Sequence, residues 1–191
     1  SGPGRTSDGH PVALLANVGS GKDAVAATGA EGVGLFRTEL LFLDRTREPG
    51  LDEQVAAYRE VFAAMAGRRV VIRTLDAGAD KPLPFLHQDG EPNPALGVRG
   101  LRIARQRPDV LTTQLAAIAQ AAIQTDADVW VMAPMVSTVA EAAEFADQID
   151  ADALAEHEDA RRRRPLPTPP VSAPPTLAAR PVLGRLSVSV H

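Results

Sequence analysis

Short apolar runs alternate along this chain with longer segments whose apolar residues recur every three to four positions. Short runs rich in Val, Ile and Leu are typical of strands buried on both faces, and the longer recurrence is typical of helices with one buried face. The expected strands are His10–Val18, Gly32–Arg37, Arg69–Leu75 and Val129–Val136. The expected helices are Gly19–Ala30, Leu51–Ala66, Gly100–Ala104, Asp109–Ile123 and Val139–Asp147. Strands that alternate with helices predict right-handed crossovers and a parallel α/β sheet.

The helical pattern is clearest in Leu51–Ala66, and the aromatic residues follow the same division between core and surface. We expect one face of this helix to lie in the core, together with Trp130 from the last expected strand. The residues on that helix face are Val55, Tyr58, Val61, Phe62 and Met65.

The two ends and one internal segment depart from this pattern. Ala77–Asn93 is rich in proline and charged residues, and we expect it to be a long functional loop. Arg161–Arg164 is a run of four arginines, and seven prolines follow between Pro165 and Pro181. Such a segment cannot bury enough apolar surface to offset its ordering entropy. The predicted organisation is a linker over 1–10, a folded region over 11–150 and a disordered, Arg/Pro-rich tail over 151–191.

Two of the expected strands end alike. Gly32–Glu39 reads GVGLFRTE and Val70–Asp76 reads VVIRTLD, so each apolar run ends in Arg-Thr with an acidic residue close behind. The carboxyl ends of parallel strands meet at the ligand-binding edge of a sheet or barrel, which would place Arg37 and Arg73 over one anion. A guanidinium group binds two carboxylate or phosphate oxygens at once, so the repeat predicts a phosphorylated or carboxylated substrate. The spacing alone leaves open that both arginines form structural ion pairs with Glu39 and Asp76.

Composition narrows the class of protein. The chain is 45% hydrophobic and carries a net charge of -4, which gives no case for nucleic acid or a membrane surface as partner. No stretch approaches the roughly 18 apolar residues of a membrane span, and the first residues lack the features of a signal peptide. The absence of cysteine excludes disulfides and thiolate metal sites. We therefore expect a cytoplasmic protein.

Four strings occur in one order along the chain: GVGLFRTELLFLD, VVIRTLDAGADKPLPFL, NPALGVRGLRIA and VMAPMVST. With them, the region from about His10 to Gln148 resembles enzyme I of the bacterial phosphoenolpyruvate-dependent sugar phosphotransferase system. Pyruvate phosphate dikinase and phosphoenolpyruvate synthase share its barrel but differ around the arginine motifs. The continuous GADKPLPFL segment favours enzyme I.

The resemblance implies a partial TIM-type (β/α)8 barrel, of about four β/α units, that binds phosphoenolpyruvate and Mg²⁺. It implies that the phosphoryl group passes to an active-site histidine in a separate N-terminal domain, then to the phosphocarrier protein HPr, and that the full enzyme is a homo-oligomer. Within the family's motifs, Arg37 and Arg73 take the positions of phosphate contacts. Arg99 of the GVR string and Lys81 of the ADK string fall at the ligand end as well.

Other motifs of that family do not occur in this sequence. They are the metal-binding Met-Val-Glu and Gly-Thr-Asn-Asp strings, a further phosphate-binding Arg, a catalytic Cys, and the Gly-Gly-x-x-Ser-His string of the phosphorylated histidine. We therefore expect about half of one catalytic barrel, which binds phosphoenolpyruvate weakly and transfers nothing alone. Its first and fourth strands would be open edges, which predicts marginal stability or self-association. The alternatives are a non-catalytic module that associates with other phosphoenolpyruvate-utilising enzymes, or a fragment of the dikinase or the synthase.

The Arg/Pro-rich tail has two explanations, which the coding DNA distinguishes. Its Arg, Pro, Ala and Leu content is what a GC-rich coding region yields in the wrong reading frame, and the alternative is a genuine tail on a short paralogue. If the frame has shifted, translation of the DNA beyond the Gln148 codon in all three frames reveals Met-Val-Glu, Asn-Asp and Gly-Met-Cys-Gly strings. Their absence from every frame would establish a genuine tail.

Overall fold

The computed structural model describes residues 3–43, 45–78, 83–86, 93, 96–163 and 187–190, with side chains up to residue 151. The strands are β1 (Ala16–Val18), β2 (Gly32–Arg37), β3 (Arg69–Arg73), β4 (Asp128–Ala133) and β5 (Ser187–Val190). The helices are α1 (Gly21–Ala26), α2 (Glu39–Phe42), α3 (Leu51–Ala64), the 3-10 turn η1 (Gly100–Arg102), α4 (Ile103–Gln106), α5 (Pro108–Ile123) and α6 (Val139–Arg163).

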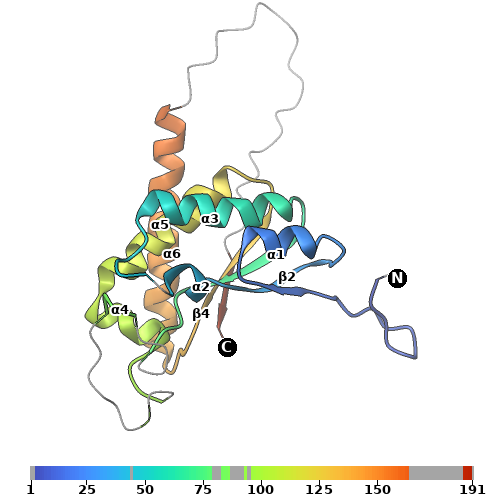
Figure 1. The fold of residues 1–191 in the computed structure, drawn as a ribbon, viewed down its shortest axis with the longest axis horizontal. Coiled ribbons are helices and arrows are strands. Elements are labelled where there is room, and N and C mark those ends of the chain that lie inside the picture. Colours follow the sequence, from blue (N-terminus) through green and yellow to red (C-terminus); the bar gives the residue numbers. More distant parts are fainter. Residues whose placement is uncertain are drawn as a thin grey trace, which may run out of the picture.

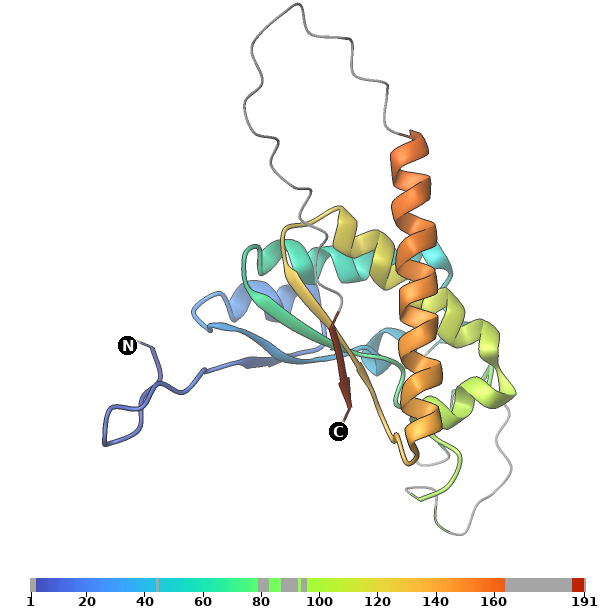
Figure 2. The same ribbon diagram turned by 180° about the vertical axis from the view of Figure 1, so that it is seen from behind.

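The strands form one parallel sheet whose order, β1-β2-β3-β4-β5, follows the sequence. Helices α1, α3 and α5 lie on one side of this sheet (Figures 1 and 2). In a doubly wound sheet the strand order reverses at a switch point and helices cover both faces. A sheet that winds in one direction with its helices outside is instead the arrangement of a barrel. The fold is therefore the predicted α/β fold, with parallel β/α units that form part of a barrel.

The main core lies between the sheet and helices α3 and α5. Phe62 of α3, Ile118 of α5 and Ile72 of β3 are fully buried in it. The apolar face predicted for the first of these helices is confirmed, because Tyr58, Val61, Phe62 and Met65 are fully buried and Val55 packs against them. The ring of Phe36 meets that of Tyr58 edge to face, with centroids 5.8 Å apart.

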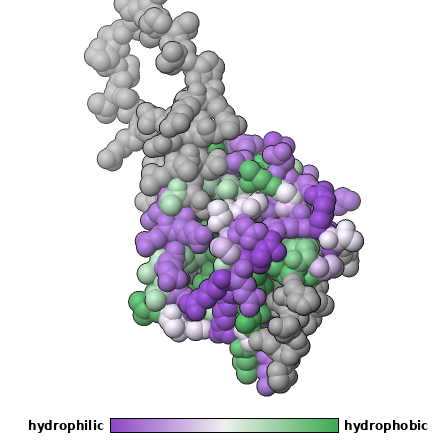
Figure 3. Space-filling view, turned by 90° about the vertical axis from the view of Figure 1, so that its left-hand side faces the viewer, coloured by the Kyte–Doolittle hydropathy of each residue, from purple (hydrophilic) through white to green (hydrophobic). Residues whose placement is uncertain are grey.

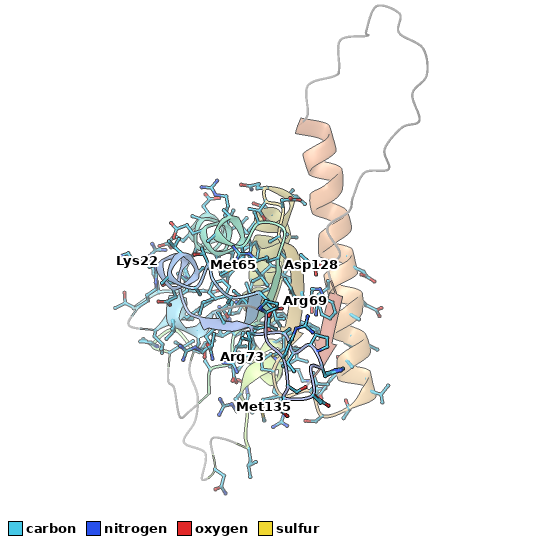
Figure 4. The ribbon with its side chains drawn as sticks, turned by 90° about the vertical axis from the view of Figure 1, so that its right-hand side faces the viewer. Lys22, Met65, Arg69, Arg73, Asp128 and Met135 are labelled. Carbon is cyan, nitrogen blue, oxygen red and sulfur yellow. The ribbon has the colours of Figure 1, made fainter. Side chains whose placement is uncertain are left out.

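The opposite side of the sheet carries a small polar and aromatic cluster. Val129 and Val131 face the helices, so Trp130, which alternates with them, faces the other way and is only half buried. The guanidinium carbon of Arg69 lies 4.1 Å from the centroid of the Trp130 ring, and Trp130 Nε1 donates to Asp128 Oδ2 at 3.1 Å. Arg69 Nε is 3.5 Å from the same carboxylate oxygen (Figure 4). The expectation that Trp130 belongs to the core thus holds for only part of its ring.

The surface seen in Figure 3 carries mainly hydrophilic side chains, with hydrophobic ones scattered among them. Within the described residues no helix combines the length and the apolar character needed to cross a membrane.

The first strand is shorter than predicted. We expected it to begin at His10, but β1 pairs with β2 only from Ala16, which lies opposite Val33. Val12 and Leu14 precede this pairing and remain exposed. The earlier residues bond outside the ladder: the Leu14 carbonyl accepts from the N–H of Glu31, which precedes β2, at 2.9 Å, and the Val12 N–H donates to the Gly4 carbonyl at 2.8 Å.

The C-terminal region holds more regular structure than the sequence predicted. Helix α6 continues to Arg163 instead of ending near Asp147, since good helix formers such as Ala, Leu and Glu recur there and the first breaker is Pro165. Strand β5 pairs in parallel with β4, so β4 is not the open edge that we expected. The second half of α6 and all of β5 fall within the predicted disordered tail over 151–191, and residues 164–186 and 191 lie outside the described residues.

The open edge at β1 leads us to expect self-association or low thermal stability. Leu14 is 54% exposed beside this edge, and a lysine there discourages pairing between edges. We expect light scattering to detect species larger than a monomer, or a thermal midpoint below about 45 °C, and Leu14→Lys to reduce the association. The control Val25→Lys alters another exposed apolar residue, on α1, and should leave the association unchanged. A sharp monomeric transition at high temperature would contradict this expectation.

Candidate functional site

The repeated Arg-Thr strings place two arginines side by side at one edge of the sheet. Arg37 ends β2, Arg73 ends β3, and the two residues are direct partners in the parallel register. Neighbouring parallel strands lie about 4.8 Å apart, and paired residues present their side chains on the same face. The structure thus brings together the two positions that the sequence analysis nominated.

The two arginines differ in their surroundings. Arg73 Nη2 lies 2.7 Å from Glu39 Oε1, and Arg73 Nη1 lies 3.2 Å from Asp76 Oδ2. Its side chain is only 18% exposed, against 5% for Glu39 and 12% for Asp76. Arg37 is exposed, and no ion pair links it to any carboxylate in the described part of the chain. The structural ion pairs that the sequence left open therefore form at Arg73.

Arg99 joins the same cluster from a distant part of the chain. Its Nε and Nη2 atoms both lie 3.2 Å from Asp76 Oδ1, so one carboxylate bridges Arg73 and Arg99. The side chains of Arg99 and Asp76 are each 12% exposed. Asp76 thus holds two guanidinium groups at the end of β3.

Gly100 explains how Arg99 reaches this position. Its backbone N–H donates to the Ala77 carbonyl at 3.2 Å, and the N–H of Leu101 donates to the Pro134 carbonyl at 3.1 Å. Gly100 has a φ of 56°, and a Cβ there would lie 3.0 Å from the Pro134 oxygen. Only glycine satisfies both the left-handed backbone and the close approach. Figure 4 shows Arg73 and Met135, which follows Pro134, toward the lower end of the view, and Arg69 and Asp128 higher up.

The charges of this cluster favour an anion. Among these five described side chains, Arg37, Arg73 and Arg99 bring three positive charges and Glu39 and Asp76 bring two negative ones, an excess of one positive charge. The positive charge of Arg37 also acts on Asp23 of α1. The pKa of Asp23 is lowered chiefly by hydrogen bonds from the Gly19 N–H and the Ser20 hydroxyl, and further by Arg37. Lys81, the fourth nominated residue, lies outside the described residues.

The same cluster does not suit a metal ion. Across the residues that the structure describes, no group of three His, Asp or Glu side chains could hold one. Both carboxylates of the cluster are engaged by arginine, and a divalent cation would be repelled by the guanidinium groups. The residues present therefore do not fit the Mg²⁺ that the family resemblance implies.

A buried polar network lies beneath the two Arg-Thr strand ends, and sequence reasoning missed it. Gln114 Oε1 accepts from the Leu75 N–H at 2.8 Å, and Gln114 Nε2 donates to Thr38 Oγ1 at 3.2 Å and to the Tyr58 hydroxyl at 3.0 Å. The Tyr58 hydroxyl donates to Gln54 Oε1 at 2.9 Å, and burial raises the pKa of Tyr58. The one available signal was a polar residue on an apolar helix face, because Gln114 lies between Leu111 and Leu115 on the buried side of α5.

Comparison with known proteins identifies a family over most of this chain. Residues 2–164 match the family described as PEP-utilising enzyme, PEP-binding domain. The phosphoenolpyruvate-protein phosphotransferase of Streptomyces coelicolor is 59% identical over 150 residues, which cover 77% of this chain and 27% of that protein. That of Staphylococcus carnosus is 44% identical over 157 residues, 81% of this chain and 26% of the relative. The multiphosphoryl transfer protein of Rhodobacter capsulatus is 43% identical over 141 residues, 73% of this chain and 17% of the relative. The chain therefore spans about a quarter or less of these relatives.

Replacing Gly100 tests the backbone crossing that brings Arg99 to the cluster. We expect Gly100→Ala to lower the free energy of unfolding by about 1–3 kcal/mol, because a Cβ at positive φ is strained and would crowd the Pro134 carbonyl. Urea unfolding followed by circular dichroism measures the change. Gly29→Ala is the control, since a Cβ at Gly29 meets nothing within 4 Å. Equal stability of the two variants would contradict the role given to Gly100.

Proposed function

This chain belongs to the family of PEP-utilising enzymes, matching their PEP-binding domain, and from that premise we propose that it binds phosphoenolpyruvate at the Arg37–Arg73–Arg99 cluster. The observation that carries the proposal is the direct register of Arg37 with Arg73 at the carboxyl ends of adjacent parallel strands. Phosphoenolpyruvate carries a phosphate and a carboxylate, and two guanidinium groups side by side suit a ligand with these two anionic groups. Lys81 belongs to the same proposal through its place in the ADK string.

Within this proposal the arginines have different tasks. Arg37 is exposed and forms no ion pair with a carboxylate in the described part of the chain, so its charge attracts an incoming phosphate. Arg73 and Arg99 are held by Asp76 before ligand arrives, which fixes their orientation and lowers the entropy that they lose on binding. Phosphoryl transfer depends mainly on positioning and on neutralising charge, and such a cluster supports both.

The complete reaction belongs to a longer protein. We propose that the parent protein is a cytoplasmic, homo-oligomeric phosphoenolpyruvate–protein phosphotransferase that uses Mg²⁺ and passes the phosphoryl group through an active-site histidine to HPr. The support is the likeness to the phosphotransferases of Streptomyces coelicolor and Staphylococcus carnosus. Because the metal-binding and phosphohistidine motifs are missing from this sequence, we expect the isolated chain to transfer nothing.

Binding of phosphoenolpyruvate to the isolated chain tests the site. We expect weak, salt-sensitive binding by isothermal titration calorimetry, and a loss of at least about tenfold in Arg37→Ala and in Arg73→Ala, since a hydrogen bond to a charged group contributes about 1.5–3 kcal/mol. Arg59→Ala is the matched control, because Arg59 is an exposed arginine on α3 that bonds to Gln124. Arg37→Ala should retain full stability, whereas Arg73→Ala also breaks the ion pairs to Glu39 and Asp76.

Two outcomes would contradict the proposal. Detectable phosphorylation of HPr by this chain alone would show that the sequence holds a complete phosphotransferase. Tight association with the full-length enzyme without any binding of phosphoenolpyruvate would favour the non-catalytic module instead.

A further inference from the structure

We infer that Gln114 is a positioning residue of the proposed anion site, whose buried amide fixes the spacing between the strand ends that carry Arg37 and Arg73. This inference rests on the function proposed above and extends it to a residue in the middle of α5. Gln114 is fully buried, so it contacts no ligand and can act only through the backbone that it holds.

One side-chain amide is bonded to both strand ends. On the β3 side, the N–H of Leu75 donates to Gln114 Oε1 at 2.8 Å. On the β2 side, Gln114 Nε2 donates to the hydroxyl of Thr38, which follows Arg37 directly. The Thr38 hydroxyl in turn donates to the Arg73 carbonyl at 2.7 Å. These three hydrogen bonds therefore connect the two Arg-Thr strings to each other.

The orientation of the amide is determined by its neighbours. A backbone N–H can only donate, so the Gln114 oxygen must face Leu75 and the amide nitrogen must face Thr38 and Tyr58. Both N–H groups of that nitrogen then have acceptors, and the Tyr58 hydroxyl donates its own hydrogen bond to Gln54 Oε1. Because the oxygen and both N–H groups of the Gln114 amide are bonded, the amide has one orientation and holds the strand ends in one relative position.

Packing alone does not explain an amide at this position. The neighbours of Gln114 on the buried face of α5 are Leu111, Leu115 and Ile118, and a leucine would fill similar space. Burying an amide is costly unless its hydrogen bonds are made. The bonds made here lead to the two strings that end in the nominated arginines.

Gln54 provides a matched control within the same network. It is also a glutamine, is also fully buried, and bonds to the Tyr58 hydroxyl and to the Pro49 carbonyl. It contacts neither strand end through any of these bonds. Gln54→Leu therefore removes a comparable buried amide and leaves the connection between Thr38 and Leu75 intact.

The test compares Gln114→Leu with Gln54→Leu in the full 191-residue chain. We expect both variants to lose stability in urea, and Gln114→Leu alone to weaken phosphoenolpyruvate binding by at least about fivefold, the lower end of typical coupling between two sites. A second readout needs no ligand: the NMR resonances of the Arg37 and Arg73 Nε–H groups should shift in Gln114→Leu and stay in place in Gln54→Leu.

The two readouts separate this inference from the proposed function. If the unmodified chain does not bind phosphoenolpyruvate, the proposed function fails, and the arginine resonances still decide whether Gln114 positions them. Equal effects of the two leucine variants on both readouts would overturn the positioning role and leave Gln114 as a stabilising residue only. If Gln114→Leu does not fold, Thr38→Val replaces it, because that change cuts the bond to the Arg73 carbonyl and keeps the one between Gln114 and Tyr58.

Discussion

The structure depends on which groups provide hydrogen-bond partners for the backbone where the strands of the parallel sheet end. Past the last ladder bond, N–H and C=O groups lose their strand partners while helices still shield them from water. Side chains and neighbouring loops replace the lost partners here: Gln114 accepts from Leu75, and Thr38 donates to Arg73. The loop at Gly100 and Leu101 is tied in the same way to Ala77 and to the end of β4. These bonds therefore fix the backbone of the strand ends from which Arg37 and Arg73 project.

The charged residues at this edge of the sheet both hold arginine side chains in place and leave positive charge to attract an anion. Asp76 holds Arg73 and Arg99 close together, although their like charges repel each other. This removes much of the rotamer freedom that binding would otherwise have to restrict. The same carboxylate lowers the net field that an anion experiences, and the exposed Arg37 on the neighbouring strand compensates for it. In this cluster Arg73 and Arg99 are held in a fixed orientation, and Arg37 supplies most of the attraction for an anion.

Much of this arrangement follows from short-range sequence patterns, and the rest depends on contacts between distant segments. Apolar runs located β2 to its exact bounds, and the rule that parallel strands end together brought Arg37 beside Arg73. The sharing of Asp76 with Arg99 requires a loop to return across Ala77, which no local pattern encodes. The role of Gln114 also depends on residues that are distant in sequence, because its amide bonds to Leu75 and Thr38. The length of α6 was underestimated because its apolar pattern weakens while its helix propensity remains high.

The group of Arg69, Asp128 and Trp130, on the side of the sheet opposite the helices, gives the protein an intrinsic fluorescence signal. Trp130 is the single tryptophan of the sequence; Arg69 of β3 lies over its ring, and Asp128 of β4 accepts a hydrogen bond from its indole N–H. The emission of an indole depends on the charges and the water around it, so its fluorescence follows the separation of these two strands. Because Arg69 and Arg73 lie on the same five-residue strand, a disturbance at the arginine edge that reaches β3 would be readable in the intrinsic emission of the protein, without any label.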